Sequence, residues 1–184
     1  MKKILVSLVA MMFLVVPMAF GLSIYPGLEL DKGPNPAISP DNSNSGLKDY
    51  LYNKYGLENP LYKSNVDDGE EGPFMGSYNT EYFNSPSDPT EATISWVGPY
   101  IVEAPAYLVV KDGRNSPFWY LFDLTFLEWD GTDALVLTGF WSDGNGAISH
   151  VELYGARSEV PEPATLLLFG AGIAGLALYR RKRS

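Results

Sequence analysis

The stretch AYLVVKDGRNSPFWYLFDLTF, residues 106–126, holds two runs of β-branched and aromatic residues on either side of a turn. Each run has the length and composition of a β-strand, and the segment DGRNSP between them is rich in turn-forming residues. Alternation in a strand places Phe118, Tyr120 and Phe122 on one face and Trp119, Leu121 and Asp123 on the other. The stretch therefore predicts two neighbouring antiparallel strands, and one of the two side-chain sets is a candidate for exposure.

Three more runs of the same kind surround it: ATISWV (92–97), ALVLTGFW (134–141) and GAISHVELYG (146–155). Turn signals separate all of them, and no helical period between them marks a crossover helix. This pattern predicts a mainly β domain over residues 92–158, an antiparallel β-sandwich or a jelly-roll-like fold. Residues 74–83 are expected to add a strand.

The preceding segment, residues 22–91, is dense in Pro, Gly, Asn and Ser and predicts a loop-rich leader. Within it, Leu47, Tyr50, Leu51 and Tyr55 fall at helical spacing. We expect one short helix near residues 47–55, ended by Gly56.

The N-terminal 21 residues have the pattern of a secretory signal peptide. Lys2 and Lys3 precede an apolar run, and the small residues Ala19 and Gly21 stand at suitable −3 and −1 positions. Cleavage is expected after Gly21, with a retained membrane anchor as the alternative.

The C-terminal stretch contains GAGIAG, residues 170–175, which has the G-x-G-x-x-G spacing of dinucleotide-binding folds. Only nine residues follow, too few for the second strand that this motif needs, so nucleotide binding is excluded. Residues 164–179 are instead free of charge and predict a transmembrane helix of about 24 Å. The basic tail Arg180, Arg181, Lys182 and Arg183 is expected on the cytoplasmic side. A buried soluble helix is the alternative.

Pro161, Glu162 and Pro163 stand directly before this apolar segment and its basic tail. In this order, residues 160–184 resemble the PEP-CTERM sorting signal of exported Gram-negative proteins. The resemblance implies that Pro161–Pro163 is the recognition motif of exosortase, a membrane-embedded processing enzyme. Residues 107–155 also resemble the exported β-domain found upstream of many such signals, a likeness that implies architecture and surface location without an activity.

The two targeting ends together imply export. The expected partners are the Sec export machinery, signal peptidase and exosortase. The C-terminal helix is expected to anchor the protein transiently in the inner membrane. The protein is then expected to reach the cell surface or the extracellular matrix.

The exported part is strongly acidic. Residues 22–160 hold seven Lys and Arg against 21 Asp and Glu, a net charge of −14. Such a surface repels nucleic acid. The chain has no cysteine, which excludes disulfides, thiolate metal sites and cysteine nucleophiles.

Residues suited to catalysis are sparse. His150 is the only histidine, and no serine nucleophile motif accompanies it, so it is expected to be structural. No pair of acids is marked by its spacing as a glycosidase pair. We predict no catalytic residue, no cofactor and no metal site. A loose calcium site on Asp67, Asp68, Glu70 and Glu71 is the alternative to a solvated acidic turn.

Aromatic residues are more abundant. Trp119, Trp129 and Trp141 are candidates for carbohydrate contact, with a purely structural role in the core as the alternative. The predicted function is a noncatalytic surface or matrix component that is associated with exopolysaccharide and contacts carbohydrate. The alternative is a secreted glycoside hydrolase-like enzyme that acts on that polysaccharide.

Overall fold

The computed structural model describes residues 21–33, 44–84, 88–112, 115–142, 144 and 146–159. These residues form one helix and ten strands. In chain order they are β1 (Leu22–Ile24), β2 (Asp31–Gly33), α2 (Asn44–Tyr55), β3 (Tyr62–Asn65), β4 (Gly69–Glu71), β5 (Tyr78–Phe83), β6 (Glu91–Trp96), β7 (Tyr100–Lys111), β8 (Trp119–Asp123), β9 (Leu135–Leu137) and β10 (His150–Glu159).

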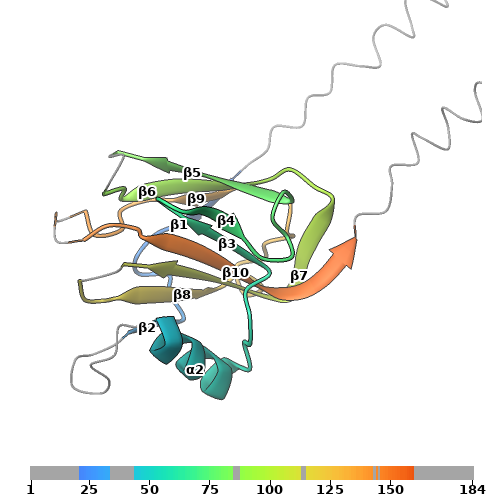
Figure 1. Cartoon of the computed structure of the whole chain (residues 1–184), viewed down its shortest axis with the longest axis horizontal. Helices are drawn as coiled ribbons and strands as arrows, with labels where there is room; N and C mark the ends of the chain where they lie inside the picture. Colours follow the sequence, from blue (N-terminus) through green and yellow to red (C-terminus); the bar gives the residue numbers. More distant parts are fainter. Residues whose placement is uncertain are drawn as a thin grey trace, which may run out of the picture.

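The strands form two sheets, as Figure 1 shows. The four-stranded sheet has the order β1-β9-β6-β5, and the six-stranded sheet has the order β2-β8-β7-β10-β3-β4. The mainly β sandwich expected from the sequence is thereby confirmed. One pairing departs from the antiparallel expectation, because β1 runs parallel to β9 with Leu22 opposite Leu135.

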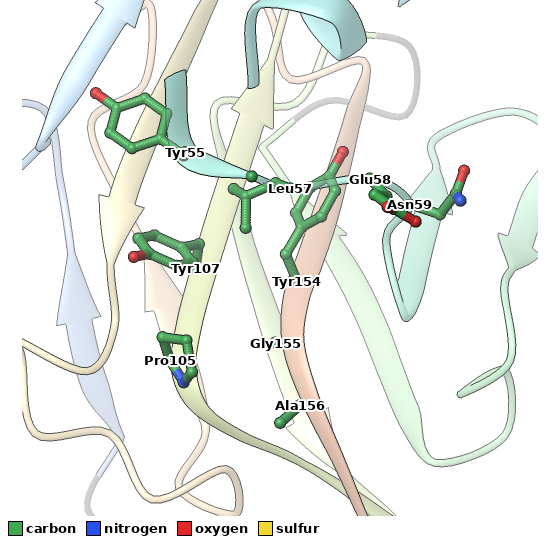
Figure 2. A pocket seen from close by; sticks show the side chains of 10 residues that line it. Tyr55, Leu57, Glu58, Asn59, Pro105, Tyr107, Tyr154, Gly155 and Ala156 are labelled. Atoms are coloured by element: carbon green, nitrogen blue, oxygen red, sulfur yellow. The ribbon is translucent and has the colours of Figure 1, made fainter. Parts of the chain in front are cut away.

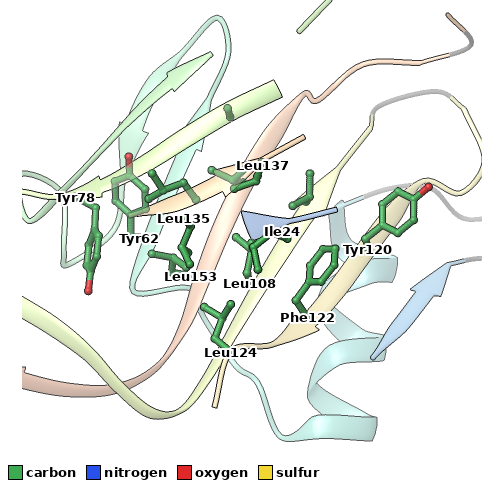
Figure 3. Packing of buried hydrophobic residues seen from close by; sticks show 14 of the residues in the cluster. Ile24, Tyr62, Tyr78, Leu108, Tyr120, Phe122, Leu124, Leu135, Leu137 and Leu153 are labelled. Carbon is green, nitrogen blue, oxygen red and sulfur yellow. The ribbon is translucent and has the colours of Figure 1, made fainter. Parts of the chain in front are cut away.

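The main core lies between the two sheets (Figure 3). Strand alternation sends Leu108 and Val110 of β7, and Val151 and Leu153 of β10, into this core. The hydroxyl of the buried Tyr78 donates to Gly131 O at 2.8 Å and accepts from Val102 N at 2.9 Å. The polar end of this aromatic side chain is thus satisfied inside the apolar layer.

A second apolar cluster lies on the opposite face of the six-stranded sheet, where α2 packs. It consists of Leu47, Leu51, Leu57, Val109, Trp119, Leu121 and Tyr154. The predicted alternation is confirmed, since Tyr120 and Phe122 belong to the main core and Trp119 and Leu121 to this cluster. Neither set forms an exposed aromatic face, because α2 covers the second face.

The helix expected near residues 47–55 is confirmed as α2. Its C-terminal end follows from Gly56, whose φ of 71° lies in the left-handed region that glycine adopts without a steric penalty. The Gly56 N–H donates to Tyr52 O at 2.9 Å, which satisfies one of the last helical carbonyls.

The described residues of the segment 22–91 form more regular structure than the predicted loop-rich leader. Besides the helix they supply β1–β5, and these strands extend both sheets. The strand expected within residues 74–83 is present as β5. Three of the others, β1, β2 and β4, have three residues each, too few to give a periodic signal in sequence.

The expected signal peptide over residues 1–21 and the transmembrane segment 164–179 fall outside the described residues, apart from Gly21. Among the helices that the structure does describe, none is long and apolar enough to cross a membrane.

Candidate functional site

A groove opens on the outer face of the six-stranded sheet, beside the C-terminal end of α2 (Figure 2). Its volume is about 430 Å³. We call it the tyrosine groove. It is lined by Tyr55, Gly56, Leu57, Glu58, Asn59, Pro105, Tyr107, Tyr154, Gly155 and Ala156.

The groove owes its shape to an irregularity in the sheet. The pairing of β10 with β7 shifts register between Tyr154 and Ala156, which is the signature of a β-bulge at Gly155. A Cβ on Gly155 would lie 2.6 Å from Val102 Cγ1 and 2.7 Å from Glu103 O, so only glycine fits there. Small residues along this part of β10 leave space beneath the loop that follows α2.

The walls combine aromatic rings with polar groups. The Tyr55 and Tyr107 rings lie 6.4 Å apart at an interplanar angle of 45°, and both side chains are half-buried. Across from them, Glu58 and Asn59 are exposed, and Asn59 Oδ1 accepts from Lys48 Nζ at 2.7 Å. Sequence reasoning missed all four residues, because three separate segments supply the groove and none of them carries a local motif.

Tyr55 is held in place by a polar clamp centred on Asp31 of β2. Asp31 Oδ2 accepts from Tyr50 OH at 2.5 Å, from Lys54 Nζ at 2.6 Å and from Tyr55 OH at 2.8 Å. Burial raises the pKa of Asp31, but these three donors outweigh burial and hold the pKa below its ordinary value. The clamp ties α2 to an edge strand of the sheet and fixes one wall of the groove.

His150, Glu152 and Tyr154 form a polar row on the same outer face. Tyr154 OH donates to Glu152 Oε2 at 2.7 Å, and His150 Nε2 lies 3.5 Å from Glu152 Oε1. Burial raises the pKa of Glu152, but the contacts with His150 and Tyr154 outweigh it, so the pKa of Glu152 lies below its ordinary value. Burial has the opposite effect on a lysine, and it lowers the pKa of the neighbouring Lys111 on β7.

The hydrogen bonds around His150 fit a structural role. Ser149 Oγ donates to Lys111 O at 3.0 Å, so its oxygen can only accept from His150 Nδ1 at 3.2 Å. The serine proton is therefore directed to the backbone and not to a base. His150 is 6% exposed, and Nε2 has no hydrogen-bond partner among the described residues. The row lacks the arrangement of an activated nucleophile.

Glu152 and Tyr154 also border a second, smaller cavity of about 230 Å³. Its other lining residues are Leu47, Lys48, Pro60, Lys63 and Glu71. Lys63 Nζ lies 3.8 Å from Glu71 Oε1, so opposite charges already face one another there.

The three tryptophans predicted to contact carbohydrate are buried. Trp119, Trp129 and Trp141 are 6%, 8% and 6% exposed. Trp129 Nε1 donates to Asp133 O at 2.7 Å, and Trp141 Nε1 donates to Pro117 O at 3.1 Å. Backbone carbonyls satisfy these indoles, so the rings pack in the interior and form no exposed platform. Aromatic rings that are partly accessible and line an opening occur in the tyrosine groove, where Tyr55 and Tyr107 are half-buried.

The acidic residues of the alternative calcium site do not converge on one point, because they make contacts with different partners. Glu70 accepts from Tyr62 OH at 2.7 Å, and Glu71 accepts from Asn65 Nδ2 at 2.7 Å. Asp67 and Asp68 are exposed in the β3–β4 turn. Within the part of the chain that the structure describes, no group of three or more His, Asp or Glu side chains is placed to hold a metal ion.

The sorting-signal residues Pro161, Glu162 and Pro163 and the basic tail Arg180–Arg183 lie outside the described residues. The described chain ends with β10 at Glu159, next to them. A family model of the PEP-CTERM protein-sorting motif matches residues 159–183. Comparison with curated proteins and comparison with solved structures give no match. The chain therefore carries a PEP-CTERM sorting motif, which supports an exported, surface-directed protein that exosortase processes.

Proposed function

We propose that this protein is a noncatalytic component of the cell surface or extracellular matrix, where it associates with exopolysaccharide. One observation carries the location in this proposal: the sorting motif begins at Glu159, the residue with which β10 ends. The sandwich thus leads directly into the sorting signal, and processing at the signal releases the exported sandwich from its membrane segment.

The targeting steps follow from the two ends of the chain. The Sec machinery exports it, and signal peptidase cleaves after Gly21. The segment 164–179 holds the precursor in the inner membrane while Arg180–Arg183 stay in the cytoplasm. Exosortase then acts at Pro161–Pro163.

A binding role is supported by the chemistry of the outer face. The Ser149 hydroxyl is directed to a backbone carbonyl, whereas the tyrosine groove offers aromatic rings and polar side chains at the surface. These are features of recognition and not of bond cleavage.

Mass spectrometry of the exported protein tests the targeting steps. We expect a mature N-terminus at Leu22 and a C-terminus near Pro161–Pro163. Glu162→Ala should leave the precursor in the membrane fraction, whereas Glu81→Ala, which alters an exposed glutamate of β5, should be processed normally. Equal processing of both variants would contradict the assigned recognition motif.

Co-sedimentation of the exported protein with purified matrix polysaccharide tests the association. We expect the protein in the polysaccharide pellet and no release of reducing ends. Release of reducing ends that stops after one carboxylate substitution would replace the proposal with the glycoside hydrolase alternative.

A further inference from the structure

We propose that the tyrosine groove is the binding site for a strand of uncharged polysaccharide. The inference rests on the proposed function, and it adds the location of the site and the class of sugar.

The shape of the groove suits an extended ligand. Its volume of about 430 Å³ lies within the range of about 300–1,000 Å³ that is common for small-ligand sites. It is open to the surface, so a long chain can lie across it without threading an end into the protein. Figure 2 shows Tyr55 and Tyr107 on one side of Tyr154, and Glu58 and Asn59 on the other.

The aromatic side suits a sugar ring. A pyranose has a face of C–H groups and an edge of hydroxyls, and a tyrosine ring likewise combines an apolar face with a polar tip. Tyr55 and Tyr107 come from α2 and β7, and both are fixed by packing against the second apolar cluster. Rings held in this way offer contact area at a low cost in conformational entropy.

The polar side suits sugar hydroxyls. The Glu58 carboxylate and the Tyr107 hydroxyl have no hydrogen-bond partner within the described ranges of the chain. Asn59 engages its side-chain oxygen with Lys48, which leaves the amide NH₂ as a donor. The groove thus presents both acceptors and a donor around its aromatic wall.

Charge selects the class of polysaccharide. Glu58 is the only charged residue among those that line the groove, and the exported part of the chain carries a net charge of −14. Uronate or sulfated chains are repelled by such a surface, whereas uncharged chains are not. A shallow groove of this kind gives weak single-site affinity, and many copies on one matrix raise it through effective concentration.

Affinity electrophoresis of the full chain in mild detergent tests the assignment. The probes are dextran and a neutral mannan, with alginate as the charged comparison. Wild type should be retarded by a neutral polysaccharide and not by alginate. Tyr107→Ala, which removes one ring, and Ala156→Trp, which fills the groove from an exposed position of β10, should each weaken binding by about tenfold or more.

Tyr52→Ala is the matched control, because Tyr52 lies on α2 at 55% exposure but outside the groove. It should bind as wild type does. Circular dichroism of every variant shows whether a loss of binding is caused by a loss of folding. If Tyr107→Ala does not fold, Ala156→Trp alone tests the groove.

The outcomes are distinguishable. If wild type binds no polysaccharide of any kind, the proposed function fails together with the groove. If wild type binds but both groove variants bind equally well, the groove assignment fails and the proposed function stands. Preferential binding to alginate overturns the inference about charge.

Discussion

The two faces of the six-stranded sheet are built from the same strands but differ in chemistry. The inner face meets the second sheet with apolar side chains such as Leu108, Phe122 and Leu153. The outer face is divided between the apolar contact with α2, the polar row on β10 and the tyrosine groove. The comparison teaches that the inner face supplies generic stability, whereas the outer face keeps openings and polar groups at the surface.

The largest effect is expected on the inner face. Phe122→Ala removes a fully buried ring that packs 5.9 Å from the Phe140 ring, and we expect a loss of about 3–5 kcal/mol in the free energy of unfolding. The control Phe126→Ala, at 82% exposure, should change it by less than about 0.5 kcal/mol. Urea unfolding measures both, and equal losses would contradict the packing of the inner face.

The next effect is expected beneath the helix. Leu51 is fully buried between α2 and the outer face, and Leu51→Ala should cost about 2–4 kcal/mol. Because Leu51 lies in the contact layer that joins the helix to the sandwich, the loss should fall on α2. Hydrogen exchange should accelerate at residues 44–55 before the strands. The control Tyr52→Ala should leave hydrogen exchange unchanged. If Leu51→Ala instead accelerates exchange equally in α2 and in both sheets, the helix and the core unfold as one unit and the prediction is contradicted.

A smaller effect is expected in the polar row. Glu152→Gln removes the charge beside His150 and should cost about 1–3 kcal/mol near neutral pH. The folded pKa of Glu152 lies below its ordinary value of 4.5, so its contribution is present above that value and is lost as pH falls through the folded pKa. The stability difference between wild type and Glu152→Gln should therefore shrink in acid. Glu81→Gln, an exposed control, should show neither the loss nor the pH dependence; a difference for Glu152→Gln that is independent of pH would contradict the charge interaction.

The smallest effect is expected at the clamp. Asp31→Asn weakens three hydrogen bonds at a partly exposed site and should cost about 0.5–1.5 kcal/mol. The folded pKa of Asp31 is lowered, so the contribution is present above pH 3.8 and fades as pH falls through the folded value. Thermal unfolding across this range measures it against Asp49→Asn, an exposed acid on the same helix. An equal effect of both substitutions would remove the special role of Asp31.

The strand-rich region was predictable because its signals are local. The runs around Leu108, Ile94 and Val151 each carry enough β-branched and aromatic residues to predict a strand alone. The helix was predictable because Leu47, Leu51 and Tyr55 repeat at helical spacing and Gly56 follows.

The burial of the outer face was not predictable in the same way. Continuous apolar composition in β8 is compatible with an exposed aromatic face or with a covered one, and only the docking of α2 decides between them. For the same reason composition left both roles of the tryptophans open, since it does not reveal the carbonyls that receive the Trp129 and Trp141 indoles.

The groove depends on contacts still more distant in sequence. Asn59 and Ala156 line the same opening although almost one hundred positions of chain separate them. A bulge at Gly155 and the loop after Gly56 must both be in place before the opening exists.

The position of β10 has a mechanical consequence. The strand lies inside the six-stranded sheet and pairs with β7 at nine positions and with β3 at four. Because its last residue is also the first residue of the sorting motif, a tension applied through the C-terminal end enters the domain along this strand. A load along the strand axis shears these backbone bonds together and does not peel them one after another. The sorting motif thus continues directly from a strand that is paired along both of its edges.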